Sequence, residues 1–191
     1  MTKWRHPTLG SMVFETYAWE TRFDSPEFAK FTFFEYDFDR EEYSPLIYFR
    51  AEDESDFPSP EVAEVGKIIA ENHRVLINSA LKLLFRDFRG ETGSSGMWWH
   101  GALDRVHESL LEIPENLGPL ECSEDLYSHL GSPSIIVQPD AYRYDQPCGI
   151  LRFEASFERE HGVGFLTDGE RILGIGDQED ICPFDKTPQN H

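Results

Sequence analysis

The sequence has few cysteines and no long apolar segment. Its three cysteines, Cys122, Cys148 and Cys182, are odd in number and far apart, without the CxxC spacing of metal and redox sites. No run of about 18 apolar residues occurs, and residues 1–10 lack the apolar stretch of a signal peptide. We therefore expect a cytoplasmic protein with reduced thiols and no membrane span.

Several catalytic motifs are also missing. Neither GxxxxGK[ST] nor GxGxxG occurs, and the sequence GVGFLTDG lies in a predicted hairpin with no helix after it, so no phosphate-binding loop is predicted. The GxSxG motif of serine hydrolases and the HExxH motif of zinc peptidases are absent as well. These absences argue against the corresponding enzyme classes, and no cofactor is predicted.

Basic residues are scarce. The chain has 17 Lys and Arg against 36 Asp and Glu, a formal net charge of -19. Phosphate contacts supply most non-specific affinity for nucleic acids, so binding to DNA, RNA or an anionic membrane surface is disfavoured. Two interpretations of the charge remain: it keeps the protein soluble, or it recognises a basic protein partner.

The chain is long enough for one domain with a substantial core. It has 191 residues, of which 39% are hydrophobic and 14% aromatic, so we treat residues 1–191 as a single domain. Strand-like segments rich in aromatic and β-branched residues occur in both outer thirds of the sequence. The predicted strands are MVFET, YAWETRF, KFTFFEYDF, LIYFRA, SIIVQ, CGILRFEASF, GVGFLT and ERILGIG, and Asp168-Gly169 marks a two-residue hairpin turn.

Helical periodicity dominates the middle of the chain. Ser59 is suited to cap a long amphipathic helix over about Pro60 to Arg89. Shorter helices are predicted over about 102–112 and in EDLYSHL. The predicted fold class is α+β, with antiparallel strands at both ends of the chain packed against the long helix. Residues 90–120 are predicted to form an inserted excursion, and residues 177–191 a frayed tail.

The segment 157–164, FEREHGVG, resembles a known signature. It is similar to the C-terminal signature of a family of uncharacterised bacterial domains, approximately Trp-Asp-Glu-Glu-His-Gly-Leu-Gly, followed by a hairpin. Phe157 replaces the family's Trp, and Arg159 replaces a carboxylate. The weaker resemblance extends over most of the chain outside 90–120. It implies a domain of unknown function, and similar domains are suspected to be immunity or partner-binding proteins of bacterial toxin systems.

The signature also supplies the best candidate for a chemical site. Glu158 and Glu160 are spaced to share one face of a strand, and His161 follows, a set that could bind a divalent cation or transfer protons. The alternative is structural: Gly162 and Gly164 indicate a bend or close backbone approach, with the acids facing water. A weaker set, His100, Asp104 and His107, falls on one helix face and is interpreted as solvated.

Two segments are candidates for a protein interface. Trp98 and Trp99 follow a Gly/Ser loop and either anchor a partner or cover a local core. The acidic run between Glu35 and Glu61 holds ten carboxylates, including Asp53, Glu54 and Asp56. We therefore expect a non-catalytic protein-binding domain, in one form an immunity-type inhibitor of a basic toxin or enzyme. The alternative is a small metal-dependent enzyme that uses Glu158, Glu160 and His161.

Overall fold

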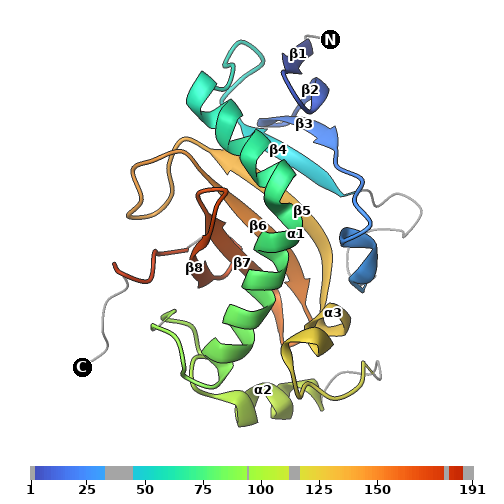
Figure 1. Ribbon diagram of the computed structural model, residues 1–191, viewed down its shortest axis with the longest axis vertical. Helices are drawn as coiled ribbons and strands as arrows, with labels where there is room; N and C mark the ends of the chain where they lie inside the picture. Colours follow the sequence, from blue (N-terminus) through green and yellow to red (C-terminus); the bar gives the residue numbers. More distant parts are fainter. Residues whose placement is uncertain (1–2, 33–44, 94, 112–116, 179–180, 187–191) are drawn as a thin grey trace.

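One mixed β-sheet organises the protein. The computed structural model describes residues 3–32, 45–93, 95–111, 117–178 and 181–186. Within these residues eight strands form a single sheet in which spatial order follows chain order (Figure 1). The strands are β1 (Lys3–His6), β2 (Gly10–Glu15), β3 (Ala18–Arg22), β4 (Leu46–Arg50), β5 (Leu130–Gln138), β6 (Cys148–Ala155), β7 (Glu158–Thr167) and β8 (Ile172–Gly176).

Neighbouring strands are antiparallel except at one pair. β4 and β5 run parallel, with Tyr48 beside Ile136. A parallel pair needs a long crossover, and here the crossover contains α1 (Pro60–Phe88), α2 (Leu103–Leu110) and α3 (Leu126–His129). The α+β class, the long helix and the shorter helices predicted from the sequence are therefore present. The sequence does not predict this parallel pair between the strands of the first third and those of the last third of the chain, because pattern alone does not show which strands become neighbours.

α1 forms where the sequence predicts it. The Ser59 hydroxyl accepts a hydrogen bond from the backbone N–H of Val62, and Pro60 occupies the first turn. The helix crosses one face of the sheet diagonally (Figure 1). Its buried stripe, which includes Ile69, Leu76 and Leu84, packs on the side chains that this face of the sheet presents.

The two faces of the sheet are covered differently. The face toward α1 carries the main core, with Trp19, Phe49, Val137 and Phe165 all fully buried. On the opposite face a second apolar cluster lies over β6 to β8, where Cys148, Ile150 and Leu166 pack with Ile181. Over β3 and β4 the same face carries no such apolar cluster among the described residues, and half-buried polar side chains such as Glu20 and Tyr48 lie there.

Several local features differ from the sequence prediction. β1 was not predicted, because four residues of mixed polarity give no clear alternation. The predicted strand KFTFFEYDF lies mostly outside the described residues. Its first residue, Lys30, ends a 3-10 helix, Phe28–Lys30, and Thr32 forms an isolated bridge to Gly131. The hairpin at Asp168-Gly169 is present, but four residues separate β7 from β8. The Asp168 carboxylate accepts the N–H groups of Glu170 and Arg171 there.

Residues 90–120, predicted to form an excursion, contribute to the main core where they are described. Trp99, Val106 and Leu120 are each at most 1% exposed. No helix in the described part of the chain is both long enough and apolar enough to cross a bilayer.

The described part of the predicted frayed tail is ordered against the sheet. Ile181 is 1% exposed, and the N–H of Phe184 donates to the carbonyl of Leu173 in β8. A Cβ at Gly164 or Gly174 would collide with backbone carbonyls of Asp177 or Cys182, so these glycines leave the room that the tail occupies. The frayed-tail prediction is therefore wrong for residues 177–178 and 181–186, because polar composition hid the apolar anchor Ile181.

Thiol reactivity tests this arrangement. Cys122 is exposed, whereas Cys148 and Cys182 are buried, and burial raises the pKa of Cys148 to about 12. We expect one thiol to react rapidly with Ellman's reagent at mildly alkaline pH in the native protein, and all three in guanidinium chloride. Replacing Cys122 by Ser should remove the fast phase. A second native thiol reacting as fast as Cys122 would show that residues 181–186 do not pack on the sheet and bury Cys148 and Cys182.

Candidate functional site around Trp98 and Glu158

The signature segment begins β7 and reaches across to the segment before α2. The Glu158 Oε2 atom accepts a hydrogen bond of 2.7 Å from the indole Nε1 of Trp98. Its Oε1 atom lies 3.4 Å from the backbone N–H of His161. Trp98 and Glu158, which the sequence analysis placed in two separate candidate sites, therefore contact each other. Both carboxylate oxygens of Glu158 accept hydrogen bonds, one from Trp98 and one from His161.

The structure does not gather the proposed catalytic trio. Glu160 and His161 are exposed, and Glu158 is committed to the indole of Trp98. Among the described residues no three His, Cys, Asp or Glu side chains lie close enough together to hold a metal ion. This geometry gives the metal-enzyme alternative no support.

The glycines of the signature have a structural role. Gly162 has a φ of +61°, in the region that favours glycine, and a Cβ there would collide with the carbonyl oxygen of Phe153 and the side chain of Gln178. Gln178 occupies this space, donating from Nε2 to that carbonyl over 2.8 Å and from its N–H to the carbonyl of His161. Gly162 and Gly164 therefore let Asp177, Gln178 and Ile181 lie against β7.

The two adjacent tryptophans differ in environment. Trp99, predicted as an interface residue, is 1% exposed and makes an edge contact with Phe157, with ring centroids 5.7 Å apart. It fills the core between the end of α1 and β7, so the interface assignment is wrong for Trp99. Trp98 is 36% exposed, and the guanidinium carbon of Arg105 lies 5.8 Å from its ring centroid. Trp98 is thus held at its edge by Glu158 and at its face by Arg105.

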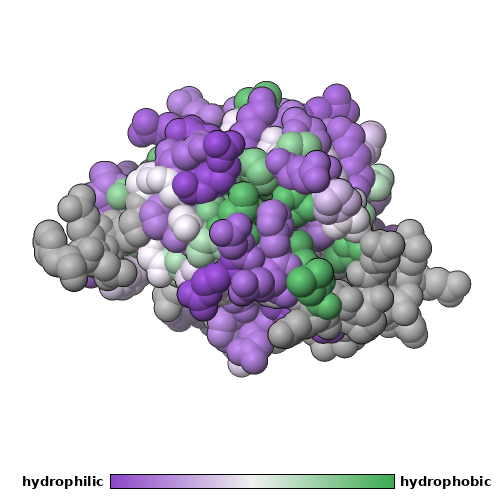
Figure 2. All heavy atoms as spheres, turned by 90° about the horizontal axis from the view of Figure 1, so that it is seen from below, coloured by the Kyte–Doolittle hydropathy of each residue, from purple (hydrophilic) through white to green (hydrophobic). Residues whose placement is uncertain are grey.

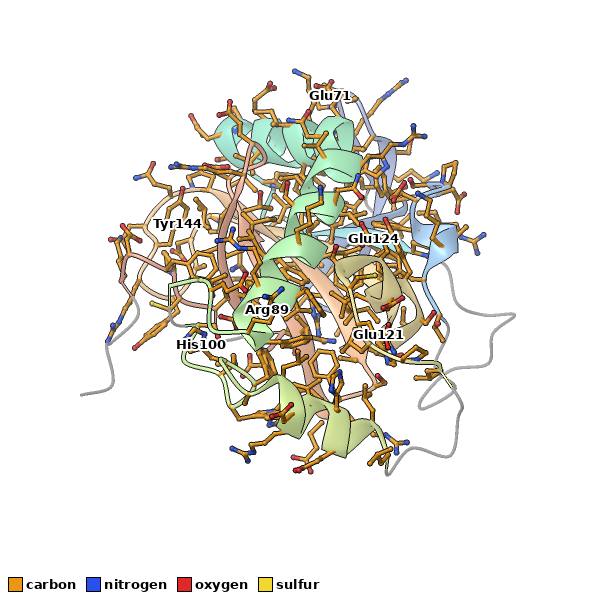
Figure 3. The ribbon with its side chains drawn as sticks, turned by 60° about the horizontal axis from the view of Figure 1, so that its bottom comes forward. Glu71, Arg89, His100, Glu121, Glu124 and Tyr144 are labelled. Carbon is orange, nitrogen blue, oxygen red and sulfur yellow. The ribbon has the colours of Figure 1, made fainter. Side chains whose placement is uncertain are left out.

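A buried carboxylate fixes the loop that leads to Trp98. Asp87, in the last turn of α1, is fully buried and accepts hydrogen bonds of 2.6 Å from Thr92, Ser95 and the Nδ1 atom of His100. Its backbone carbonyl accepts the N–H of Gly101. Figure 3 shows His100 on the loop beside Arg89 at the end of α1. Thr92 and Ser95 on one side of Trp98, and His100 and Gly101 on the other, therefore tie this loop to the helix.

His100, Asp104 and His107 do not form a site together. His100 is paired with Asp87, and the Nε2 atom of His107 donates to the carbonyl of Leu120 over 2.8 Å. Asp104 is exposed on α2. Each histidine therefore has a structural hydrogen bond. His100 lies on the loop before α2, which directs it toward α1 and away from His107.

The end of the molecule near α2 has apolar surface surrounded by charge. Leu111, directly after α2, is 86% exposed. Figure 2 shows apolar side chains near the centre of this end, with hydrophilic ones above and below them. A recess of about 540 Å³ lies beside Arg105, which lines it together with Arg89, Glu91 and Asp104.

The acidic loop, residues 52–56, lies before the first residue of α1, at the end of the helix away from Trp98. Two of its carboxylates stabilise the loop itself: Asp53 accepts the N–H and hydroxyl of Ser55, and Asp56 accepts the N–H of Glu52. These hydrogen bonds from Ser55 lower the pKa of Asp53. α1 has 29 residues and is therefore roughly 40 Å long at a rise of about 1.5 Å per residue, with the acidic loop before its start and the loop of Trp98 after its end. The two predicted interface elements are therefore separate surfaces. Most of the remaining acidic run, residues 33–44, lies outside the described residues.

A family model for a domain of unknown function, DUF6985, matches residues 8–182. The chain belongs to the DUF6985 family. This match confirms the prediction, from the FEREHGVG segment, of a family with no known function. No curated protein and no solved structure matches the chain.

Sequence reasoning missed the residues that fix the site of this DUF6985 domain. Asp87 and Arg105 were not singled out, because a carboxylate and a guanidinium on amphipathic helices are typical of solvated faces. The one available signal for Asp87 was its place in the apolar stripe, one residue before Phe88, where a charged side chain needs partners.

Replacing Gly162 tests the structural role of the signature. Gly162→Ala should lower the free energy of unfolding by about 1–3 kcal/mol, because it adds backbone strain and a clash with Phe153. Gly10→Ala is the matched control: Gly10 has a φ of +85° but open space around its Cα, so this variant isolates the strain. Equal losses in urea unfolding of the two variants would contradict the close approach of residues 177–178 to β7.

Replacing Asp87 tests the anchoring of the loop. Asp87→Ala leaves three buried or half-buried donors without an acceptor and should lower the free energy of unfolding by about 3–5 kcal/mol. The control is Glu71→Ala, on the outer surface of the same helix (Figure 3), which should change stability by less than about 0.5 kcal/mol. A loss below about 1 kcal/mol in Asp87→Ala would show that its hydrogen bonds do not hold the loop.

Proposed function

We propose that this DUF6985 domain is a non-catalytic protein-binding domain that presents Trp98 to a partner with a basic surface. The observation that carries the proposal is the fixed, partly exposed indole of Trp98, held by Glu158 and Arg105. Tryptophan and arginine are enriched among the few interface residues that carry most of the binding energy. A side chain that is already ordered loses little conformational entropy when a partner covers it.

The surroundings of Trp98 suit such a contact. The recess beside Arg105 presents Arg105 and Asp104 together with the ion pair of Arg89 and Glu91, and Leu111 adds exposed apolar area at the same end. The polar rim around an apolar centre is the usual anatomy of a protein interface.

The charge of the chain favours a basic partner. With a net charge of -19, long-range attraction accelerates encounter with a basic protein and opposes encounter with an acidic one. Immunity-type inhibition, in which the domain occupies the basic active site of a toxin, is the specific form that the family resemblance favours.

The experiment compares two exposed aromatic residues. The tagged domain is used to capture proteins from its native host at low salt, as wild type and as the variants Trp98→Ala and Tyr142→Ala. Tyr142 is the matched control, because it is 54% exposed and also has an arginine, Arg143, over its ring, 5.1 Å from the centroid. We expect a basic protein that wild type and Tyr142→Ala capture and Trp98→Ala does not.

Calorimetry with the captured protein measures how much binding free energy is lost when Trp98 is replaced. Trp98→Ala should weaken binding by about 2 kcal/mol or more, roughly thirtyfold in Kd. The association rate should fall steeply between low and physiological salt. Equal affinity of the two variants, or an association rate independent of salt, would contradict the proposal.

A charge reversal distinguishes the two ends of the molecule. Glu52→Lys with Glu54→Lys alters the acidic loop and spares the Asp53 and Asp56 carboxylates that stabilise it. If Trp98 anchors the partner, this double variant should slow association and leave dissociation nearly unchanged. Loss of all binding would indicate that the partner binds at the acidic loop and not at Trp98.

A further inference from the structure

The face of the sheet away from α1 contains a pocket over its central strands. Side chains alternate along a strand, so the burial of Trp19 and Phe49 against α1 places Glu20 and Tyr48 on the opposite face. Glu20 lies beside Tyr48, and Tyr48 lies beside Ile136 on β5. A pocket of about 250 Å³ opens here. That volume is below the range of about 300–1,000 Å³ for drug-sized ligands, so it suits a small metabolite.

The pocket has an apolar base. Ala18 and Ile136 line it together with the rings of Tyr17 and Tyr48. Tyr17, at the β2–β3 turn, is 69% exposed. A ligand with an apolar portion would therefore bury that portion against these four residues and cover the exposed ring.

Charges of opposite sign line different parts of the pocket. Glu15 and Glu20 come from the β2–β3 hairpin, whereas Arg50 and Arg152 come from β4 and β6. Arg50 forms no ion pair with Glu15 or Glu20, nor with any other described residue. Arg152 is oriented by Gln178, whose Oε1 atom accepts from Nε and Nη2. The carboxylates and guanidinium groups thus face a shared space in which Arg50 and the two glutamates are not neutralised by each other.

The pocket is partly shielded from water. Burial, and then the nearby charge of Glu15, raises the pKa of Glu20. Burial, and then the charge of Glu20, raises the pKa of Tyr48, while Arg152 lowers it. Tyr48 therefore lies between negative and positive charge and keeps its hydroxyl proton as a hydrogen-bond donor. Perturbed titratable groups that share a pocket are typical of binding sites.

We propose that this pocket binds a free α-amino acid with an apolar side chain. The ammonium group would lie at Glu15 and Glu20, the carboxylate at Arg50 and Arg152, and the side chain against Ala18 and Ile136. A simple anion would meet the two glutamates as well as the net negative charge of the chain. A simple cation would meet the two arginines. A zwitterion satisfies both sets of charges, and guanidinium groups are well suited to bind a carboxylate.

The test uses the full chain and amino acids that lack one charge. Thermal shift and calorimetry are run with leucine and phenylalanine, with their carboxamides, which lack the carboxylate, and with their N-acetyl forms, which lack the ammonium. We expect leucine or phenylalanine to raise the melting temperature and bind, with each modified form at least about tenfold weaker. No binding by either amino acid at millimolar concentration would overturn the proposal, as would a modified form that binds equally well.

Variants assign the binding to this pocket. Arg50→Gln and Glu20→Gln should each weaken amino acid binding by about tenfold or more. Arg22→Gln is the matched control: Arg22 lies on β3, on the same face as Glu20, and does not line the pocket. Trp98→Ala should also leave amino acid binding unchanged, so this test is independent of the proposed protein interface. Equal affinity of Arg50→Gln and Arg22→Gln would place the ligand elsewhere and overturn the proposal.

Discussion

The close approach of α1 to the sheet is the contact on which the rest of the structure depends. Glycine inside a helix costs about 1 kcal/mol relative to alanine, yet Gly66 lies within α1, in its second turn. A Cβ at Gly66 would collide with the ring of Phe49, and a Cβ at Gly149 of β6 would collide with Ile69 of α1. Glycine on the helix and glycine on the sheet thus both shorten the distance between the two layers. The helix joins β4 to the strands of the last third by packing on both.

This arrangement determines where each candidate surface lies. Because α1 occupies one face of the sheet, the polar residues of β3 and β4 are left on the other, where they form the amino acid pocket. Because the C-terminal end of α1 contacts Phe157 just before β7 begins, Asp87 can hold the loop that carries Trp98 beside Glu158. The acidic loop and Trp98 lie at opposite ends of the same helix, so one partner would need a long contact to cover both.

Local sequence patterns predicted most helices and strands, but they did not predict which distant segments pair with each other. The Ser59-Pro60 start and the helical period predicted α1, because capping and periodicity are properties of neighbouring residues. The parallel pairing of β4 with β5 depends on how the crossover returns, which no local pattern encodes. The Trp98 to Glu158 hydrogen bond joins residues 60 positions apart. Each residue was singled out from the sequence for its chemistry, but their contact exists only once β7 and the segment before α2 meet.

The signature segment connects the two proposed surfaces. From the pocket, Arg152 donates to Gln178, Gln178 donates to the carbonyl of His161, the N–H of His161 donates to Glu158, and Glu158 accepts from Trp98. A contiguous path of this kind does not by itself couple two sites, since coupling requires an element with two arrangements that both ligands bias. Gly162 and Gln178 hold the path in one arrangement by close contact with β6. The segment therefore acts as a rigid support that positions Arg152 on one face and Trp98 at one end, and the two binding free energies should add.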